Sequence, residues 1–121
     1  MSRRDVGRRG EDLAVAHLQA LGYRIRERNY RCRLGEIDVV AEQGDVLVVV
    51  EVKARRSHAY GTPAEAITPA KAARLAALVE HYRSNRESLP PRSRVDVVTV
   101  DLNARMELLR IAVIENAVEG S

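Results

Sequence analysis

The sequence predicts a single α/β domain over residues 1–121, in which helices flank a mixed β-sheet in the order helix, three strands, helix, two strands. Two stretches have the apolar spacing of amphipathic helices, and the segments between and after them are short runs rich in valine. A length of 121 residues suffices for one modest core. Because phenylalanine and tryptophan are absent, we expect that core to consist of valine, leucine, isoleucine and alanine.

The first helix is predicted from about Asp5 to Leu21, and Gly22 follows where helices often need a left-handed residue. Its inward stripe at heptad-like spacing is Gly7, Glu11, Ala14, Leu18 and Leu21, with Gly10 beside it. Glycines here let the helix approach a neighbour or a ligand closely. Glu11 falls in the buried seam, where a carboxylate is costly without an opposing cation. The alternative is that Glu11 lies at the edge of the stripe and pairs with a nearby arginine.

Three strands are predicted next, two of them in a central hairpin. Tyr23 to Arg31 alternates apolar residues with arginine, which predicts an edge strand with a basic outer face. Within Gly35 to Lys53, Asp38–Ala41 and Val46–Val50 have the β-branched composition of buried strands. Gly44-Asp45 between them suits a two-residue turn with positive φ at the glycine.

The register of this hairpin predicts a cluster of charged side chains. If Gly44-Asp45 is the turn, Gln43 faces Val46, and counting back along the ladder places Asp38 opposite Glu51. The two Cβ atoms would then lie about 5 Å apart, too close for two buried anions without a cation or a proton between them. Lys53 lies on the same face as Glu51, because side chains alternate along a strand. The sequence therefore predicts aspartate, glutamate and lysine around one point.

The remaining elements complete the domain. Ala54 to Thr68 is rich in arginine, serine, glycine and proline and predicts a mobile loop over the site. Thr68-Pro69 is a good N-cap and first-turn pair for a second amphipathic helix from Pro69 to about Asn85. Arg94 to Val100 predicts another strand, and Leu108 to Ile114 is either a last strand or a docked tail.

Charge is concentrated at the N-terminal end. The formal net charge is +3, yet the chain through Arg33 holds nine arginines against four acids, a net charge of +5. An arginine-rich surface suits a phosphate backbone, although a solvated basic face has the same composition. Cys32 is the only cysteine, which excludes an internal disulfide and fits a reducing compartment. No apolar run resembles a membrane span or a signal core, so we expect a soluble cytoplasmic protein.

The predicted cluster suits phosphodiester hydrolysis. That reaction needs a hard cation such as Mg²⁺, which is held by carboxylates, a carbonyl and waters. Asp38 and Glu51 supply the carboxylates, and Lys53 can orient or deprotonate water and offset charge on the transition state. Lys53 is one of only two lysines against eighteen arginines. Lysine is also the cation whose charge proteins can tune, whereas arginine stays charged.

Three short motifs carry a family resemblance. Gly35-Glu36-Ile37-Asp38 followed by Val50-Glu51-Val52-Lys53, and preceded by Gly7-x-x-Gly10-Glu11, resembles the PD-(D/E)xK nuclease superfamily. More closely, the chain from Gly7 through Asn116 resembles the small bacterial YraN family, which is related to Holliday-junction resolvases. Here Ile37-Asp38 replaces the superfamily's Pro-Asp signature, at a position where relatives vary.

The resemblance implies a restriction-endonuclease-like core and roles for individual residues. Asp38 and Glu51 would be ligands of Mg²⁺ or Mn²⁺, joined by the carbonyl of Val52. Glu11 would bind a second metal or a metal-bound water, and Lys53 would be the catalytic lysine. Resolvase relatives act as dimers, which makes a homodimer an expectation for this chain.

Two functions follow as hypotheses. The first is a Mg²⁺-dependent DNA endonuclease acting on branched or junction DNA. The alternative is a nucleic-acid-binding module that keeps the fold and acts in a larger assembly without cutting. A third interpretation, a structural ion-pair network, is weaker because buried ion pairs add little net stability. The cations expected to contact nucleic acid are Arg8, Arg9, Arg31, Arg33, Arg55, Arg56 and Lys71. Without an aromatic stacking platform, we expect recognition of shape and phosphates.

Overall fold

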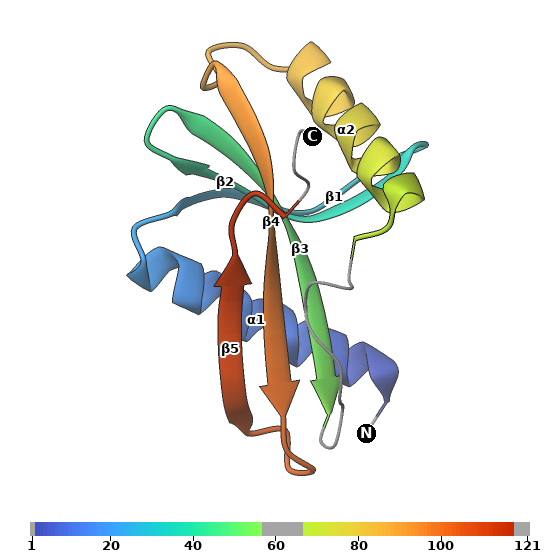
Figure 1. The fold of residues 1–121 in the computed structure, drawn as a ribbon, viewed down its shortest axis with the longest axis vertical. Helices are drawn as coiled ribbons and strands as arrows, with labels where there is room; N and C mark the ends of the chain where they lie inside the picture. The colour runs from blue at the N-terminus through green and yellow to red at the C-terminus, as the bar shows by residue number, and fades with distance from the viewer. Residues whose placement is uncertain (1, 57–66, 118–121) are drawn as a thin grey trace.

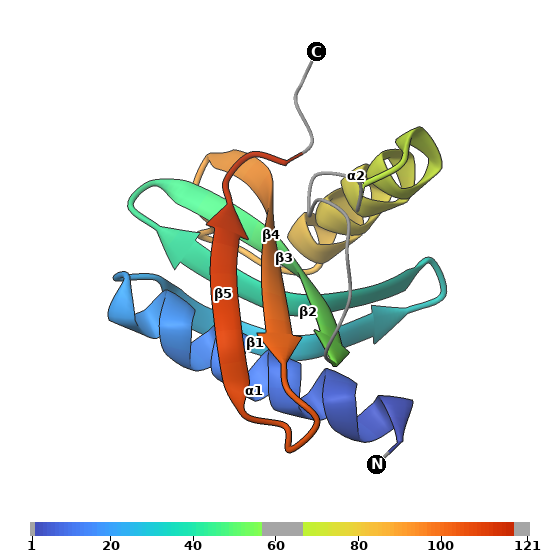
Figure 2. The same cartoon turned by 60° about the horizontal axis from the view of Figure 1, so that its bottom comes forward.

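The computed structural model describes residues 2–56 and 67–117, which form a five-stranded sheet with helices on both sides (Figure 1). The elements are α1 (Arg3–Ala20), β1 (Arg24–Cys32), β2 (Gly35–Gln43), β3 (Val46–Arg56), α2 (Pro69–Ser84), β4 (Arg92–Leu102) and β5 (Leu108–Ile114). This is the predicted element order. Figure 2 shows α1 and α2 on opposite sides of the sheet. Neither helix is long and apolar enough to cross a membrane, within the ranges described.

The sheet is mixed, as predicted. Its strand order is β1-β2-β3-β4-β5, with β3 and β4 parallel and every other neighbouring pair antiparallel. The parallel pair needs a crossover connection, and α2 lies within it. β1 is an edge strand, as its sequence predicted. β5 pairs with β4 and forms the other edge, so the last apolar segment is a strand and not a docked tail.

The central hairpin has the predicted turn, and its ladder has the predicted register as far as Val39 and Val50, but the predicted pair of Asp38 and Glu51 is not part of it. Gly44 has φ +60°, and the β2–β3 ladder runs from Gln43 opposite Val46 to Val39 opposite Val50. Beyond that last pair, β2 continues beside β1 alone and β3 continues beside β4 alone. The sheet therefore forks, and the next residues along the two strands are Asp38 and Glu51.

Close packing fixes α1 on one face of the sheet. Its buried residues are Gly10, Ala14, Val15 and Leu18. A Cβ atom on Gly10 would lie 2.3 Å from the Cβ of Ala54 in β3, so the glycine permits the close approach that the sequence predicted. Gly22 has φ +97°, which confirms the left-handed residue after the helix. The inclusion of Gly7 and Leu21 in the inward stripe was wrong. Gly7 is exposed, and no atom lies within 4 Å of a Cβ built on it. The helix ends at Ala20, and Leu21 is 52% exposed.

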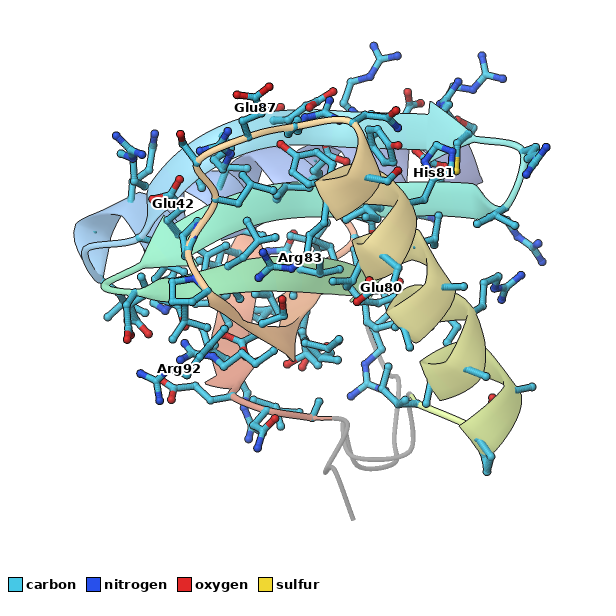
Figure 3. The ribbon with its side chains drawn as sticks, turned by 90° about the horizontal axis from the view of Figure 1, so that it is seen from above. Glu42, Glu80, His81, Arg83, Glu87 and Arg92 are labelled. Carbon is cyan, nitrogen blue, oxygen red and sulfur yellow. The ribbon has the colours of Figure 1, made fainter. Side chains whose placement is uncertain are left out.

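The second core lies between α2 and the opposite face. The buried residues of α2 are Leu75, Leu78, Val79 and Tyr82. Thr68 caps the helix as predicted, because its Oγ1 accepts the backbone N–H of Lys71 at 3.1 Å. The rings of Tyr30 and Tyr82 pack edge to face at 5.0 Å, and the Tyr30 hydroxyl contacts Nδ1 of His81 at 2.6 Å. Figure 3 shows His81 on α2. These contacts attach α2 to β1.

Two further expectations need correction. Residues 54–56, predicted as the start of a loop, belong to β3, because the parallel ladder with β4 extends to Arg56. Residues 57–66 of the predicted loop lie outside the described residues, and residues 67 and 68 lead into α2. The basic outer face expected for β1 is not one surface either. Arg26 bonds to Tyr82 of α2 and Arg28 to Glu11 of α1, since the strand has a register shift after Ile25.

Candidate functional site

A basic groove of about 1080 Å³ lies between the first half of α1 and the fork in the sheet. Among the described residues, six cationic side chains line it: Arg3, Arg4, Arg8, Arg31, Lys53 and Arg55. Three carboxylates line it as well: Glu11, Glu36 and Asp38. Arg3 and Arg4 were not among the cations predicted to contact nucleic acid. Helical spacing was the available signal, because Arg4 and Arg8 precede Glu11 by seven and three positions and share its face.

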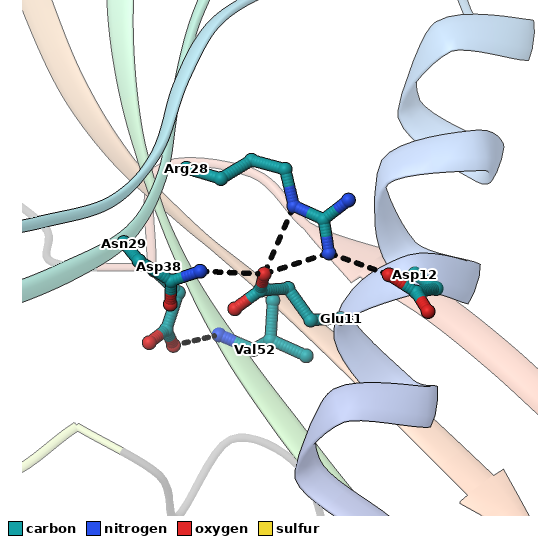
Figure 4. Close-up of polar contacts among 6 residues, drawn as sticks. All are labelled: Glu11, Asp12, Arg28, Asn29, Asp38 and Val52. Atoms are coloured by element: carbon teal, nitrogen blue, oxygen red, sulfur yellow. Dashed lines mark hydrogen bonds and ion pairs between the residues drawn. The ribbon is translucent and has the colours of Figure 1, made fainter.

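Asp38 lies at the fork between β2 and β3. Its Oδ2 accepts the backbone N–H of Val52 at 2.8 Å (Figure 4), which replaces the ladder bond that β2 no longer provides. Asp38 lines both the basic groove and a second cavity. Burial is the main cause that raises the pKa of this carboxyl to about 6; the hydrogen bond from Val52 lowers the pKa, and the negative charges of Glu51, Glu36 and Glu11 add to the rise. No lysine or arginine among the described residues forms an ion pair with it.

Glu51 is the most deeply buried carboxylate of the predicted set, with 7% of the residue exposed. It lines the second cavity, about 240 Å³ in volume, together with Asp38, Lys71 and Arg74. The Nζ of Lys53 lies 3.3 Å from Oε2 of Glu51, and the Nζ of Lys71 forms an ion pair with the same oxygen. The structure therefore brings Asp38, Glu51 and Lys53 together at the fork.

Glu11 has a different environment. Its Oε1 accepts from Nε and Nη2 of Arg28 at 2.9 and 2.7 Å and from Nδ2 of Asn29 at 3.1 Å (Figure 4). Arg28 also binds Asp12 at 2.6 Å. Pairing with an arginine was the alternative left open for Glu11. The residue lines the basic groove with Asp38 but does not line the cavity that holds Glu51.

The charge environment of Asp38 is suited to a hard divalent cation. Asp38 is half-buried, is surrounded by other acids and lacks an ion-pair partner among the described residues, so a cation would relieve its repulsion. Carboxylate and carbonyl oxygens are the ligands that Mg²⁺ and Mn²⁺ prefer. Within residues 2–56 and 67–117, however, no three His, Cys, Asp or Glu side chains form a ready ligand group. Asp38, Glu51 and the carbonyl of Val52 are the residues that can hold such a cation.

The cations predicted to contact nucleic acid lie in different parts of the structure. Those that line the basic groove are Arg8, Arg31 and Arg55. Lys71 lines the second cavity instead. Arg9 donates through Nε to the carbonyl of Met106 at 3.2 Å, which turns it toward the β4–β5 connection. Arg33 and Arg56 are exposed but lie outside the groove lining.

A family model and individual relatives match the chain, and both carry the same family description. A sequence model of the family described as "Uncharacterised protein family UPF0102" matches residues 10–100. A UPF0102 protein of Symbiobacterium thermophilum is 52% identical over 117 residues, which cover 97% of this chain and 98% of the relative. A UPF0102 protein of Caldicellulosiruptor saccharolyticus is 43% identical over 117 residues, covering 97% and 99%. The matched segment contains all three predicted carboxylates and Lys53.

Proposed function

Because the chain belongs to the UPF0102 (YraN) family, whose description names no reaction, we propose its function from the site itself. It is a metal-dependent endonuclease of the PD-(D/E)xK type that hydrolyses DNA phosphodiester bonds, with branched or junction DNA as its substrate class. The observation that carries this proposal is a groove lined by six cations that has a half-buried carboxylate, Asp38, at the fork of the sheet. A polyanion with a reactive phosphate fits that combination of charges.

The groove would bind DNA through its backbone. Guanidinium groups contact phosphate oxygens in pairs, and four of the arginines come from the first turns of α1 and from β1: Arg3, Arg4, Arg8 and Arg31. None of the lining residues within 2–56 and 67–117 is aromatic, so this part of the groove offers no stacking surface for bases. Affinity should therefore depend on phosphate geometry and weaken steeply as salt rises.

Asp38 and Glu51, with the carbonyl of Val52, would hold Mg²⁺ or Mn²⁺, and the bound ion would polarise the phosphate and activate water. Lys53 reaches the groove with 41% of its side chain exposed, so its ammonium can donate to a phosphate oxygen and offset charge in the transition state. Glu11, held by Arg28 and Asn29 on the α1 wall, can accept a hydrogen bond from water in the groove.

The decisive experiment compares cleavage of labelled four-way junction, flap, duplex and single-stranded DNA with Mg²⁺ or Mn²⁺. We expect the wild type to cut at least one substrate, and folded Asp38→Ala and Lys53→Ala variants to cut none. Cleavage that persists in both variants would assign the activity to a contaminant or to other residues. The preferred substrate of the wild type would identify its class of DNA structure.

A second candidate is a non-cleaving nucleic-acid-binding module in a larger assembly. The observation that favours it is the ion pairing of Glu11 and Glu51 with side-chain cations, which leaves only Asp38 of the three predicted acids without such a partner in the described chain. In this case the wild type would bind DNA with a steep salt dependence and leave it intact in either metal.

The cellular setting follows from the same proposal. A cytoplasmic location fits both a DNA substrate and the free thiol of Cys32, the lone cysteine. A homodimer would let two active sites meet the two strands of a junction. Sedimentation of the purified protein with and without a four-way junction would measure that stoichiometry.

A further inference from the structure

Both lysines of this chain contact one oxygen atom. The sequence has eighteen arginines and only two lysines, and the Nζ atoms of Lys53 and Lys71 both lie at Oε2 of Glu51. The two residues are far apart in the sequence and come from β3 and α2, so local spacing does not explain their meeting. Lysine is a compact, strongly hydrated point charge, whereas arginine is a planar fork. A compact ammonium can occupy the place of a small cation beside a carboxylate.

Lys71 is the more firmly placed of the two lysines. Its backbone N–H is bound by the capping hydroxyl of Thr68, and its helix is anchored by Leu75, which lines the same cavity. Its side chain is 27% exposed, against 41% for Lys53, whose ammonium lies 3.3 Å from the carboxylate and reaches the basic groove. Lys71 is therefore the principal counter-ion of a glutamate side chain that is only 9% exposed.

We propose that Lys71 is a built-in competitor of the divalent cation: it neutralises Glu51 in the metal-free protein and must give up Oε2 when the metal binds. This inference rests on the metal site of the proposed function. A buried carboxylate without a partner is strongly destabilising, so the ammonium keeps the empty site folded. The same contact weakens metal binding, because the ion must first replace a charge-assisted hydrogen bond. Lys71 thus sets the metal concentration at which the site fills.

The test measures Mn²⁺ affinity directly, from the electron paramagnetic resonance signal of free Mn²⁺ during titration of the protein without DNA. The variant is Lys71→Met, and the matched control is Arg74→Met, which removes the same charge from the same helix and cavity without touching an ion pair of Glu51 among the described contacts. We expect Lys71→Met to bind Mn²⁺ about tenfold more tightly than the control, the range of one charge-assisted hydrogen bond.

A second variant and a melting measurement control for misfolding of Lys71→Met. Lys71→Arg keeps a cation beside Glu51 and should bind Mn²⁺ no more tightly than the wild type. In EDTA, Lys71→Met should melt below the wild type, and saturating Mn²⁺ should remove that difference, which also reports whether the variant is folded.

The outcomes separate the two proposals. Tighter Mn²⁺ binding by Lys71→Met than by Arg74→Met supports competition. Equal affinities of these two variants, or weaker binding by Lys71→Met, overturn it while the wild-type affinity still supports the metal site. If neither the wild type nor any variant binds Mn²⁺, the metal site of the proposed function is refuted, and the proposal that Lys71 competes with the metal is refuted with it.

Discussion

Replacing Asp38 with asparagine should make the metal-free protein more stable, although Asp38 is central to the proposed chemistry. The carboxyl is half-buried, and it faces the negative charges of Glu51, Glu36 and Glu11. Asparagine has the same shape and can still accept the N–H of Val52 through its amide oxygen. The substitution therefore removes a repelled charge and keeps the hydrogen bond.

The magnitude follows from linkage between protonation and folding. The pKa of Asp38 is about 6 in the folded protein and about 4 in the unfolded chain. The fold favours the protonated carboxyl, so this contribution to stability is complete below about pH 4 and is lost as the pH rises to about 6. Two pKa units correspond to about 3 kcal/mol, and partial exposure of the group reduces the expected cost to about 2 kcal/mol at pH 7. A gain of that size would raise Tm by roughly 8 °C.

Thermal unfolding in EDTA at pH 4.5 and pH 7.5 measures this effect, because EDTA keeps any metal from masking the repulsion. The difference in Tm between Asp38→Asn and the wild type should be large at pH 7.5 and small at pH 4.5. Asp45→Asn is the control, since Asp45 is an exposed turn residue whose pKa is lowered by its hydrogen bond to Arg92. A destabilised Asp38→Asn at pH 7.5, or a gain independent of pH, would refute the reasoning.

Two other predictions concern packing and the groove. Gly10→Ala should destabilise the protein by about 1–3 kcal/mol in urea unfolding, because the new methyl would lie 2.3 Å from the Cβ of Ala54. Gly7→Ala, with no atom within 4 Å, should instead stabilise α1 by about 0.5–1 kcal/mol, and equal effects of the two substitutions would contradict the packing. Arg8→Ala should weaken DNA binding and lower the slope of log affinity against log salt by about one, whereas Arg92→Ala, outside the groove, should leave both unchanged in fluorescence anisotropy.

Much of the fold was predictable because its determinants are local. The turn at Gly44, the cap at Thr68 and the left-handed Gly22 each depend on a few neighbouring residues. The register from Gln43 opposite Val46 to Val39 opposite Val50 follows from a two-residue turn, and the ladder ends one pair before Asp38 and Glu51. The position of Lys53 beside Glu51 follows from the alternation of side chains along a strand.

Other features depended on residues distant in the sequence. Strand lengths were underestimated because the parallel β3–β4 ladder extends β3 to Arg56, and no local signal marks a parallel partner. Leu21 fits the apolar spacing of α1, but the helix ends before it can reach the core.

The sequence by itself determined that Asp38, Glu51 and Lys53 lie near one another, since their order along β2 and β3 places them at the fork of the sheet. Only the tertiary structure decided how each charge is balanced. Arg28 reaches Glu11 and Lys71 reaches Glu51 because α1 and α2 dock against opposite faces of the sheet, while Asp38, at the fork between β2 and β3, receives only the N–H of Val52 from the described residues. Docking of helices depends on the shapes of whole apolar faces, and a pattern of single residues does not contain it.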